Sequence, residues 1–349
     1  MKVELLNKSE YYKLETFLKK IPHSLVYYST IYKDFLEAFL EEKSFYFILK
    51  ENDEIVAMLP SMLKVNKRYG NVLNSLPFYG SNGGVISISN SEEVNRILIQ
   101  AFSQFAIENN CISSTIITSP FEDMIDWYEE NVDYTFKDQR VGQITRMSDN
   151  KEDLMSIYHY KTRNTVRKSL NGLKKIDYKN GLDYLDFIID THKENLTAIN
   201  GLYKPRSFFE EVVRKFKYNE NLRIYIGFGE NDQPISGLLN LYYNKTVEYF
   251  SPVTVSTYRE LQPLSGLIYQ AMEDAISNGY QWWNWGGTWL SQGGVYQFKS
   301  RWGTADHNYY YYTKIYDNSV LTLSPEVLLS EYPYFFVLPF SELTVNKLD

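Results

Sequence analysis

The chain has 349 residues, of which 44% are hydrophobic and 23% are charged. This length is typical of two domains, and the composition excludes a disordered, fibrous or collagen-like chain. With 36 basic and 43 acidic residues the formal net charge is −7, so the protein as a whole is not a general binder of polyanions. The single cysteine, Cys111, excludes an intrachain disulfide framework, and the four scattered histidines lead us to expect no metal site.

The first eight residues lack the long apolar run of a signal peptide. The longest apolar stretch, residues 332–340, is interrupted by Pro333 and Pro339 and is much shorter than the roughly 20 residues that span a bilayer. We therefore expect no transmembrane segment and a cytoplasmic location.

Two stretches of sequence predict antiparallel hairpins. Residues 45–50 and 55–59 are rich in β-forming side chains and are separated by a polar turn that contains Asn52 and Asp53. Residues 222–228 and 235–241 repeat the pattern around Asn231 and Asp232, and residues 246–250 add a third strand. Asn and Asp tolerate the left-handed backbone that tight hairpin turns require.

Each predicted hairpin is preceded by helical sequence, at residues 30–42 and 207–217, and followed by an amphipathic helix and a strand. The following helices begin at Ser91 and near Leu264, with apolar side chains three and four residues apart. This repeat predicts two α/β modules with mixed sheets, at residues 1–150 and 151–349, the last 30 or so residues being able to pack on the first module. Chance alternation of helices and strands is the other explanation.

Common nucleotide-binding and hydrolase motifs are absent from the sequence. It contains neither Gly-x-Gly-x-x-Gly nor a phosphate loop, neither Gly-x-Ser-x-Gly nor His-Glu-x-x-His. Dinucleotide binding, serine hydrolysis and zinc hydrolysis therefore have no support.

A basic segment at residues 161–179 contains seven cations and a single acid, Asp177. In a chain of net negative charge this is a marked local asymmetry. Arg163 and Arg167 are spaced to share one face of a helix, where they are able to bind a phosphate or carboxylate. A solvated helix surface is the alternative.

A second segment joins Trp285-Gly286-Gly287 to Phe298-Lys299. Glycine has no Cβ, so a strand that ends in two glycines lets a ligand approach the backbone closely. Lys299 is then able to neutralise charge that develops during a reaction. The alternative is a strand bulge with core tryptophans. A weaker candidate is the Pro/Gly loop at residues 76–85, in which Tyr79 is a possible groove wall.

Together these segments resemble the FemAB-like aminoacyl/acyltransferases of the GNAT superfamily. The resemblance covers about 230 residues. Its pieces are Pro77-Phe78-Tyr79-Gly80, the basic helix at 161–168, the hairpin at 234–243, residues 258–263, and Trp285-Gly286-Gly287 followed by Phe298-Lys299-Ser300-Arg301-Trp302-Gly303. It implies tandem GNAT-like modules and transfer of an acyl or aminoacyl group to an amine, on a peptidoglycan-type precursor or another cell-surface polysaccharide of the cell envelope.

We expect direct attack of the amine on the acyl carbonyl, with Lys299 as the catalytic cation. The expected substrate-binding residues are Tyr79, Arg163, Arg167, Tyr258, Trp285, Gly286, Gly287 and Phe298. No general base is identified, since the orientation of Glu248 is not given by the sequence.

No tightly bound cofactor is expected, the acyl donor being a co-substrate that is either acyl-CoA or aminoacyl-tRNA. Residues 258–267 depart from the acetyl-CoA motif because Pro263 removes an amide, and residues 180–220 are too short for the helical hairpin of tRNA-dependent members. The other partner would be a small-molecule, glycan or peptide acceptor.

Two alternatives from other classes stay open. One is a non-catalytic saccharide- or peptide-binding protein that keeps the fold, favoured by the altered donor segment and by 31 tyrosines. The other is nucleic-acid binding through residues 161–179, which the net charge opposes.

Overall fold

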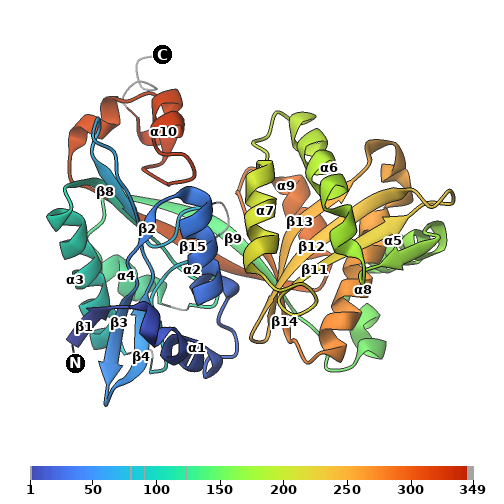
Figure 1. The fold of residues 1–349 in the computed structure, drawn as a ribbon, viewed down its shortest axis with the longest axis horizontal. Helices are drawn as coiled ribbons and strands as arrows, with labels where there is room; N and C mark the ends of the chain where they lie inside the picture. Colours follow the sequence, from blue (N-terminus) through green and yellow to red (C-terminus); the bar gives the residue numbers. More distant parts are fainter. Residues whose placement is uncertain (1, 79–80, 90, 123, 344–349) are drawn as a thin grey trace. The chain divides into compact units, whose positions relative to one another are not determined.

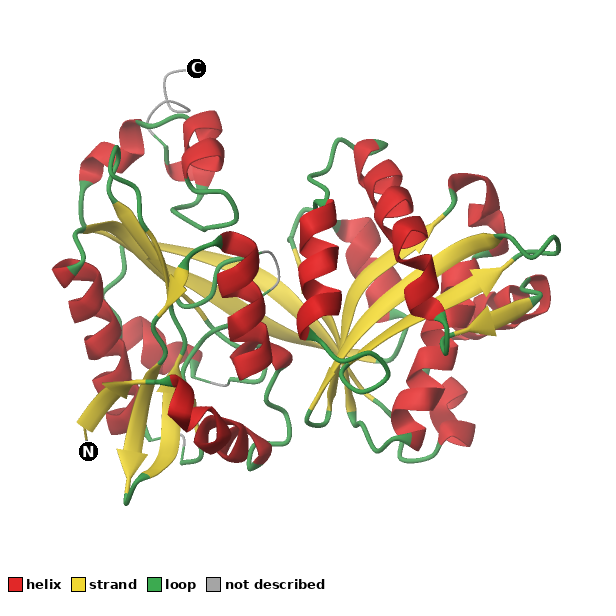
Figure 2. Cartoon of the chain, viewed as in Figure 1, coloured by secondary structure: helices red, strands yellow, loops and turns green. Residues whose placement is uncertain are grey.

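The computed structural model of the chain describes residues 2–78, 81–89, 91–122 and 124–343. It separates into two compact units, each of which combines β-sheet with flanking helices (Figures 1 and 2). Unit 1 comprises Met1–Val141 and His307–Asp349, and unit 2 comprises Gly142–Asp306. The predicted α/β class with mixed sheets is confirmed.

The strands of unit 1 are β1 (Lys2–Leu5), β2 (Lys43–Ser44), β3 (Phe47–Glu51), β4 (Glu54–Leu59), β5 (Met62–Lys64), β6 (Asn71–Asn74), β7 (Ile86–Ser87) and β8 (Cys111–Ile117). Its helices are α1 (Tyr11–Lys19), α2 (Thr30–Leu40), α3 (Glu92–Glu108), α4 (Ile125–Asn131) and α10 (Pro325–Glu331). Two long strands, β9 (Phe136–Arg146) and β15 (Thr304–Ile315), each contain one of the points where the chain passes from one unit to the other.

Unit 2 contains the strands β10 (Lys175–Asp177), β11 (Leu222–Phe228), β12 (Pro234–Tyr243), β13 (Thr246–Thr254) and β14 (Trp282–Thr288). Its helices are α5 (Tyr160–Gly172), α6 (Leu185–Thr197), α7 (Arg206–Lys215), α8 (Pro263–Ser277) and α9 (Gly293–Ser300).

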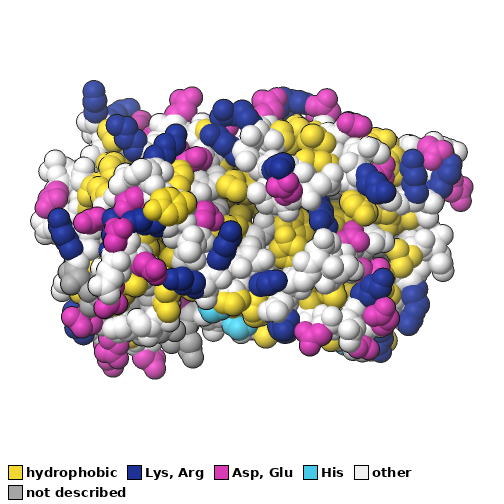
Figure 3. Space-filling view, turned by 60° about the horizontal axis from the view of Figure 1, so that its bottom comes forward, with side chains coloured by type: hydrophobic (Ala, Val, Ile, Leu, Met, Phe, Trp, Pro, Cys, Tyr) yellow, Lys and Arg dark blue, Asp and Glu magenta, His cyan; other side chains and the backbone are white. Residues whose placement is uncertain are grey.

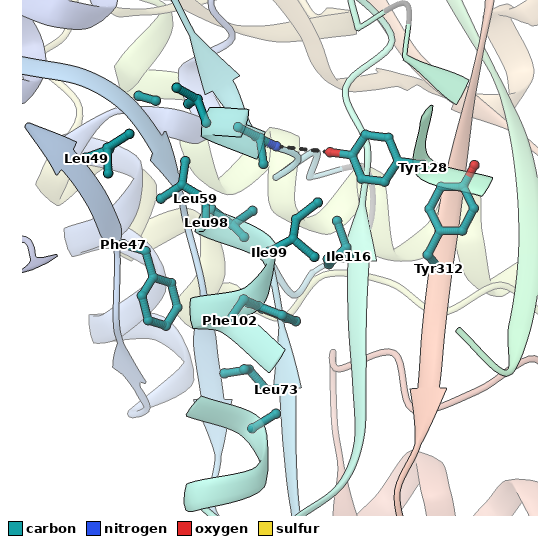
Figure 4. Close-up of a cluster of buried hydrophobic side chains, with 14 of the residues drawn as sticks. Phe47, Leu49, Leu59, Leu73, Leu98, Ile99, Phe102, Ile116, Tyr128 and Tyr312 are labelled. Carbon is teal, nitrogen blue, oxygen red and sulfur yellow. Dashed lines mark hydrogen bonds between the residues drawn. The ribbon is translucent and has the colours of Figure 1, made fainter. Parts of the chain in front are cut away.

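Unit 1 has a small antiparallel sheet in the order β1-β3-β4-β7 and a second sheet in the order β15-β8-β6-β5-β2. In the second sheet β6 and β8 run parallel and are connected through α3. Figure 4 shows apolar side chains from α3, β3, β4, β6 and β8 in one cluster, together with Tyr128 of α4 and Tyr312 of β15. The rings of Tyr128 and Tyr312 stack at 5.3 Å between centroids.

Both predicted hairpins are present, as β3/β4 and β11/β12. Asn52 and Asp53 adopt positive φ angles of 49° and 67°, as does Asp232 at 58°. Hairpin turns with positive φ match the twist of the paired strands, which explains why short polar residues occupy these positions.

The sheet of unit 2 has the order β10-β11-β12-β13-β14, in which β11, β12 and β13 form an antiparallel meander. Its strands converge at one end and spread apart at the other (Figure 2). Helix α8 connects β13 to the parallel strand β14, beginning with Pro263 at its first position and ending just before Gly279, whose φ is 79°. The apolar stripe of α8 packs on Tyr225, Leu238 and Trp283.

The observed units divide differently from the predicted modules. The predicted boundary lies near residue 150, whereas unit 2 begins at Gly142, and the last part of the chain, from His307, belongs to unit 1. Residues 311–315 of β15 pair with β8, which is far away in the sequence. The sequence analysis allowed the end of the chain to pack on the first module, but local hydrophobic periodicity does not encode the pairing of β15 with β8.

Candidate active site

The candidate site lies in unit 2, where the parallel strands β13 and β14 stop pairing. They are hydrogen-bonded in register only from Thr246↔Trp282 to Glu248↔Asn284, although β13 continues to Thr254 and β14 to Thr288. Beyond this point the two strands are not paired with each other. A ligand with amide groups can therefore pair with them.

On the β13 side, the strand carries a bulge. Leu239 of β12 pairs with Ser251 and Asn240 pairs with Tyr249, so Phe250 is the extra residue. The carbonyl of Phe250 accepts a hydrogen bond of 3.1 Å from Nζ of Lys204. Bulges interrupt regular pairing and redirect the backbone, and they are frequent beside active sites.

Lys204 lies in the loop between α6 and α7, with its ammonium over the rings of Phe250 and Phe208 at 4.5 and 5.0 Å. Burial lowers the pKa of Lys204 to about 8. Its backbone N–H donates to Nε2 of His192 at 3.0 Å. Burial, and to a smaller extent the nearby charge of Lys204, lower the pKa of His192 to about 4, so this imidazole is a neutral acceptor at physiological pH.

The lowered pKa of Lys204 makes stability depend on pH. Between about pH 8 and 10.5 the unfolded chain still holds this proton while the folded protein has released it, so the free energy of unfolding rises with pH in this window. We expect Lys204→Met to reduce the rise between pH 8 and 10 by on the order of 2 kcal/mol, measured by urea unfolding. The exposed lysine variant Lys193→Met should keep the wild-type rise; an equal rise in Lys204→Met would contradict the assignment.

On the β14 side, Gly286 adopts a φ of 71°, and a Cβ at this position would meet no atom within 4 Å. Its N–H donates to Oδ1 of Asn284 at 2.9 Å. The glycine is therefore required by the left-handed backbone and not by crowding, and the space beside it is open.

The side chain of Lys299, in α9, binds the C-terminal part of β14. Its Nζ contacts the carbonyls of Gly286 and Gly287 at 3.4 and 3.2 Å and Oγ1 of Thr288 at 2.9 Å. The side chain is 6% exposed, and burial lowers its pKa to about 8. We expected the two glycine amides beside Lys299, but their carbonyls are the groups that bind it.

Asp306 is the acid nearest to Lys299 in the sequence and the natural candidate for an ion pair with it. Oδ2 of Asp306 instead accepts from the hydroxyl of Tyr296 at 2.6 Å. Within residues 2–78, 81–89, 91–122 and 124–343, no carboxylate forms a salt bridge with Lys299. The charge of Lys299 is thus balanced by carbonyl and hydroxyl dipoles alone.

Glu248 and Asn284, the last pair in register, both have buried side chains, 2% and 1% exposed. Nδ2 of Asn284 donates to Oε2 of Glu248 at 2.8 Å, while Oδ1 of Asn284 accepts from the N–H of Gly286. A carboxylate is therefore held at the point where the two strands part, and Asn284 connects it to the Gly286 turn.

The predicted binding residues Trp285 and Phe298 lie in and against the core of unit 2. Nε1 of Trp285 donates to Oγ1 of Thr145 at 2.9 Å, and its ring lies 5.5 Å from that of Trp302. Phe298 is partly buried against the same cluster, edge-on to Trp285. These rings hold α9 and β14 together, which places Lys299 next to Gly286.

The predicted basic helix is α5. The half-buried Arg163 donates from Nη1 to the carbonyl of Tyr158 at 2.7 Å, whereas the exposed Arg167 contacts only Oδ1 of Asn164, at 3.3 Å, among the described hydrogen bonds. Lys168 donates to the carbonyl of Glu260. The cations of α5 therefore differ, and Arg167 is the more available of the two predicted anion-binding residues.

The remaining predicted residues are Tyr258 and Tyr79. The hydroxyl of Tyr258, in the segment before α8, accepts from Nε2 of Gln233 at 2.8 Å. Tyr79 lies outside the described residues. The N-terminal amides of α8 are partly used, since the N–H of Gly266 donates to Oγ of Ser169 at 2.9 Å and Pro263 has none.

Lys204, His192 and Asn284 were not predicted as site residues. Lys204 lies in a short polar loop. Its contact with Phe250 depends on the bulge in β13, which no local sequence pattern predicts. Asn284 lies between two tryptophans in a strand. A polar residue in a buried strand needs a hydrogen-bond partner, and this was the feature of the sequence that could have indicated a role for Asn284.

On the face drawn in Figure 3, acidic and basic side chains are interspersed, with hydrophobic side chains between them. In the part of the chain that the structure describes, no group of three or more His, Cys, Asp and Glu side chains is placed to hold a metal ion. No described helix has both the length and the apolar content to cross a bilayer.

Comparison with known proteins identifies the fold. The model of the acetyltransferase (GNAT) domain family matches residues 160–300, which span α5 to α9. Unit 2 is similar to a GNAT domain over this range. No curated protein matches the sequence.

Solved structures extend the GNAT likeness to nearly the whole chain. The crystal structure of FemX superposes with a TM-score of 0.73 at 13% identity, over 95% of this chain and 100% of that chain. A tandem GNAT protein from the clavulanic acid biosynthesis pathway gives 0.52 at 8% identity, over 90% and 98% of the two chains. The C-terminal domain of a putative lysylphosphatidylglycerol synthetase from Agrobacterium fabrum gives 0.55 at 10% identity, over 94% and 99%.

These matches confirm the predicted tandem GNAT fold, and the family match over residues 160–300 supports the predicted acyltransferase class. Unit 2 follows the expected order of hairpin, third strand, helix and parallel strand. Identities this low define the fold, and the substrates are considered below.

Proposed function

We propose that the protein is an N-acyltransferase that forms an amide between an activated acyl group and an amino group on a cell-surface saccharide or a peptidoglycan-type precursor. The observation that carries the proposal is the end of pairing between β13 and β14, flanked by Lys204 at Phe250 and Lys299 at Gly286. The donor would enter between these strands, pairing its amide groups with backbone groups of β13 and β14 beyond the last pair in register.

Lys299 would stabilise the oxyanion that forms when the amine attacks the acyl carbonyl. Its three N–H groups already face three acceptors, of which the carbonyl of Gly286 is the most distant at 3.4 Å. This weakest contact is the one that an oxyanion would replace. The dipoles that hold the ammonium are then already oriented, which is the condition for strong electrostatic catalysis.

Glu248 would accept the proton that the amine loses on attack. Its carboxylate is buried at the point where the strands part and is oriented by Asn284. General-base catalysis by a positioned carboxylate contributes about 10²- to 10⁴-fold. No covalent enzyme intermediate is needed, because the amine attacks the donor directly. When the tetrahedral intermediate collapses, the bond between the acyl carbon and the sulfur or oxygen of the donor would break, and the donor would leave as its thiol or hydroxyl form with the proton taken from the amine.

The acceptor would bring an anionic group to α5. We expect Arg167→Ala to raise KM about threefold to tenfold while kcat changes little, since an exposed charge contributes mainly to ground-state binding. The difference in KM should shrink as salt is added. Arg214→Ala, which removes an exposed arginine from α7, is the control; equal KM values for both variants and the wild type would leave α5 a solvated surface.

The function is tested by incubating the protein with amino-sugar and peptidoglycan-precursor acceptors and three donors: acyl-CoA, acyl-pantetheine and aminoacyl-tRNA. Mass spectrometry of the acceptor detects the new amide. Acyl-pantetheine is included because Gly266 and Pro263 leave few amides at the start of α8 for a pyrophosphate. Donor consumption without amide formation, or no reaction with any pair, would contradict the proposal.

A non-catalytic binding protein is the second candidate, and the same observation on α8 favours it. Saturable binding of an acceptor without turnover of any donor would support it. Glu248, Lys204 and Lys299 favour the enzyme over the binding protein. Burying these groups costs desolvation free energy, which a site without a catalytic role would have no reason to bear.

A further inference from the structure

Unit 1 contains a pocket of about 210 Å³, room for about seven water molecules. It lies where the chain leaves α1, beside β7 and the segment that follows β8. The residues that line it are Lys20, Ile21, Pro22, His23, Ser24, Tyr28, Val85, Ile86, Ser87, Ile88, Ser119, Phe121, Glu122 and Met124.

The pocket is separate from the position in unit 1 that corresponds to the β13/β14 site. The corresponding strands are β6 and β8, which are parallel and connected through α3. Beyond β8, the N–H of Gly83 donates to the carbonyl of Ile117 at 2.9 Å, and Nδ2 of Asn82 donates to the carbonyl of Thr118 at 3.0 Å. The chain itself therefore occupies the backbone groups that a donor would use in unit 1.

Glu122 is the acid of the pocket. Its Oε2 accepts from the N–H of Ser119 at 3.3 Å, while its buried Oε1 has no hydrogen-bond partner among the described residues. The hydroxyl of Tyr28, whose side chain is 1% exposed, is likewise buried without a hydrogen bond of normal geometry, although Ser119 and Gly84 lie beside it. Among the described residues, Oε1 of Glu122 and the hydroxyl of Tyr28 are thus two buried polar atoms of one pocket that have no hydrogen bond of normal geometry.

The backbone is shaped around this carboxyl group. A Cβ on Gly84 would lie 2.5 Å from Oε2 of Glu122 and 3.1 Å from Cα of Thr118, so glycine leaves the space that the carboxyl group fills. The hydroxyl of Tyr128, seen in Figure 4 accepting from the N–H of Val85 at 3.4 Å, also interacts with the carboxyl group of Glu122.

The other walls combine apolar and polar side chains. The rings of His23 and Phe121 lie 5.3 Å apart at one side, and Ile21, Pro22 and Met124 contribute further apolar surface. The nearest cation, Lys20, is bound to Glu54 at 2.8 Å. A pocket in which one oxygen of a buried carboxyl group has no hydrogen-bond partner among the described residues, with aromatic and aliphatic side chains beside it, suits a small organic cation.

We propose that this pocket binds a small ligand with a primary ammonium group, which donates to Oε1 of Glu122 and to the hydroxyl of Tyr28 while its short apolar body contacts Phe121 and Ile21. An ammonium group supplies three N–H donors and a positive charge. It can therefore donate to both Oε1 of Glu122 and the hydroxyl of Tyr28. A carboxylate ligand would be repelled by Glu122. A neutral alcohol would not balance the negative charge of Glu122.

Protonation of Glu122 gives the site a predictable response to pH. Burial raises the pKa of Glu122 to about 7. Burial lowers the pKa of His23 and raises those of Tyr28 and Tyr128, so these three groups stay neutral near pH 7 to 8. Lys20 remains paired with Glu54, whose pKa is lowered by that contact. Glu122 therefore changes its charge between about pH 6 and 8, and His307, whose ring lies 6.1 Å from that of Phe121, is a further ionisable group beside the pocket.

The test is calorimetric titration of the full chain with three probes of equal size: n-butylammonium, n-butanol and butyrate. We expect saturable binding of n-butylammonium only, about tenfold tighter at pH 8 than at pH 6, because about a tenth of Glu122 is ionised at the lower pH. Glu122→Gln should weaken this binding at least tenfold. Asp274→Asn, which neutralises a half-buried acid in unit 2 with a raised pKa, should leave it unchanged.

Equal binding of n-butanol and n-butylammonium, or unchanged binding by Glu122→Gln, would overturn the proposal. If Glu122→Gln does not fold, the pH series on the wild-type protein decides, since an affinity that does not change between pH 6 and 8 is incompatible with recognition by Glu122. Neither readout depends on acyl transfer, so the outcome is independent of the proposed function.

Discussion

Replacing Lys299 with methionine should lower kcat about 100-fold at neutral pH. The ammonium is buried next to Gly286 and is the cation expected to face the oxyanion, and one preorganised donor of this kind is worth about 3 kcal/mol. The measurement is the rate of amide formation at saturating donor and acceptor, with the thermal midpoint determined on the same preparation.

The folded state should tolerate this change. Lowering the pKa of Lys299 from 10.5 to about 8 corresponds to a cost of about 3 kcal/mol for keeping the charge buried at neutral pH. Methionine removes that cost, which offsets the hydrogen bonds lost by Gly287 and Thr288. Thr288→Val is the matched control, because it deletes the shortest contact of Lys299 but keeps the charge, and it should retain most of the activity.

The dependence of activity on pH tests the role of Lys299 independently. Activity should fall as pH rises through about 8, because the folded protein then loses the proton of Lys299. Arginine stays charged in this range, so Lys299→Arg should lose this alkaline limb even if its larger head lowers the rate. Normal turnover by a folded Lys299→Met protein would remove the catalytic assignment.

Glu248→Gln should reduce kcat/KM by about 100-fold, the second largest effect expected. Glutamine keeps the size of the side chain and can still contact Asn284, but it cannot accept the proton of the attacking amine. The measurement is kcat/KM across pH with an acceptor amine of known pKa. A wild-type value in a folded Glu248→Gln protein would show that the buried acid is structural.

Asn284→Ala separates the role of the carboxylate from that of its surroundings. This variant keeps Glu248 but removes the amide that donates to its Oε2. The ionised form then loses a donor, so the acidic limb of kcat/KM should move to higher pH instead of disappearing. A profile identical to that of the wild type would mean that Glu248 takes no part in the measured reaction.

The sequence was sufficient where the structure depends on local chemistry. The hairpin turn at Asn52 and Asp53 was predicted because few residues other than glycine accept positive φ, and the structure has both residues there. Helix α8 was predicted from its apolar spacing, and Gly279 follows its end as expected. In each case the information lies within a few residues.

The site was only partly accessible from the sequence. The proximity of Gly286, Gly287 and Lys299 was predicted from glycines and aromatic residues within one segment, and the contacts with Lys299 confirm that they lie together. The direction of their peptide groups was not predictable, since it depends on the φ of Gly286. Lys204 and Glu122 were missed because their surroundings are assembled from elements that are distant in the sequence.

The division of the chain has a consequence for its synthesis. Unit 2 is continuous, from Gly142 to Asp306, whereas unit 1 needs β15, which supplies a neighbour for β8 and the aromatic ring that stacks on Tyr128. A ribosome therefore completes the later unit before the earlier one can close its sheet. During that interval the buried strand β8 has an open edge, the kind of surface that recruits other chains and that chaperones cover.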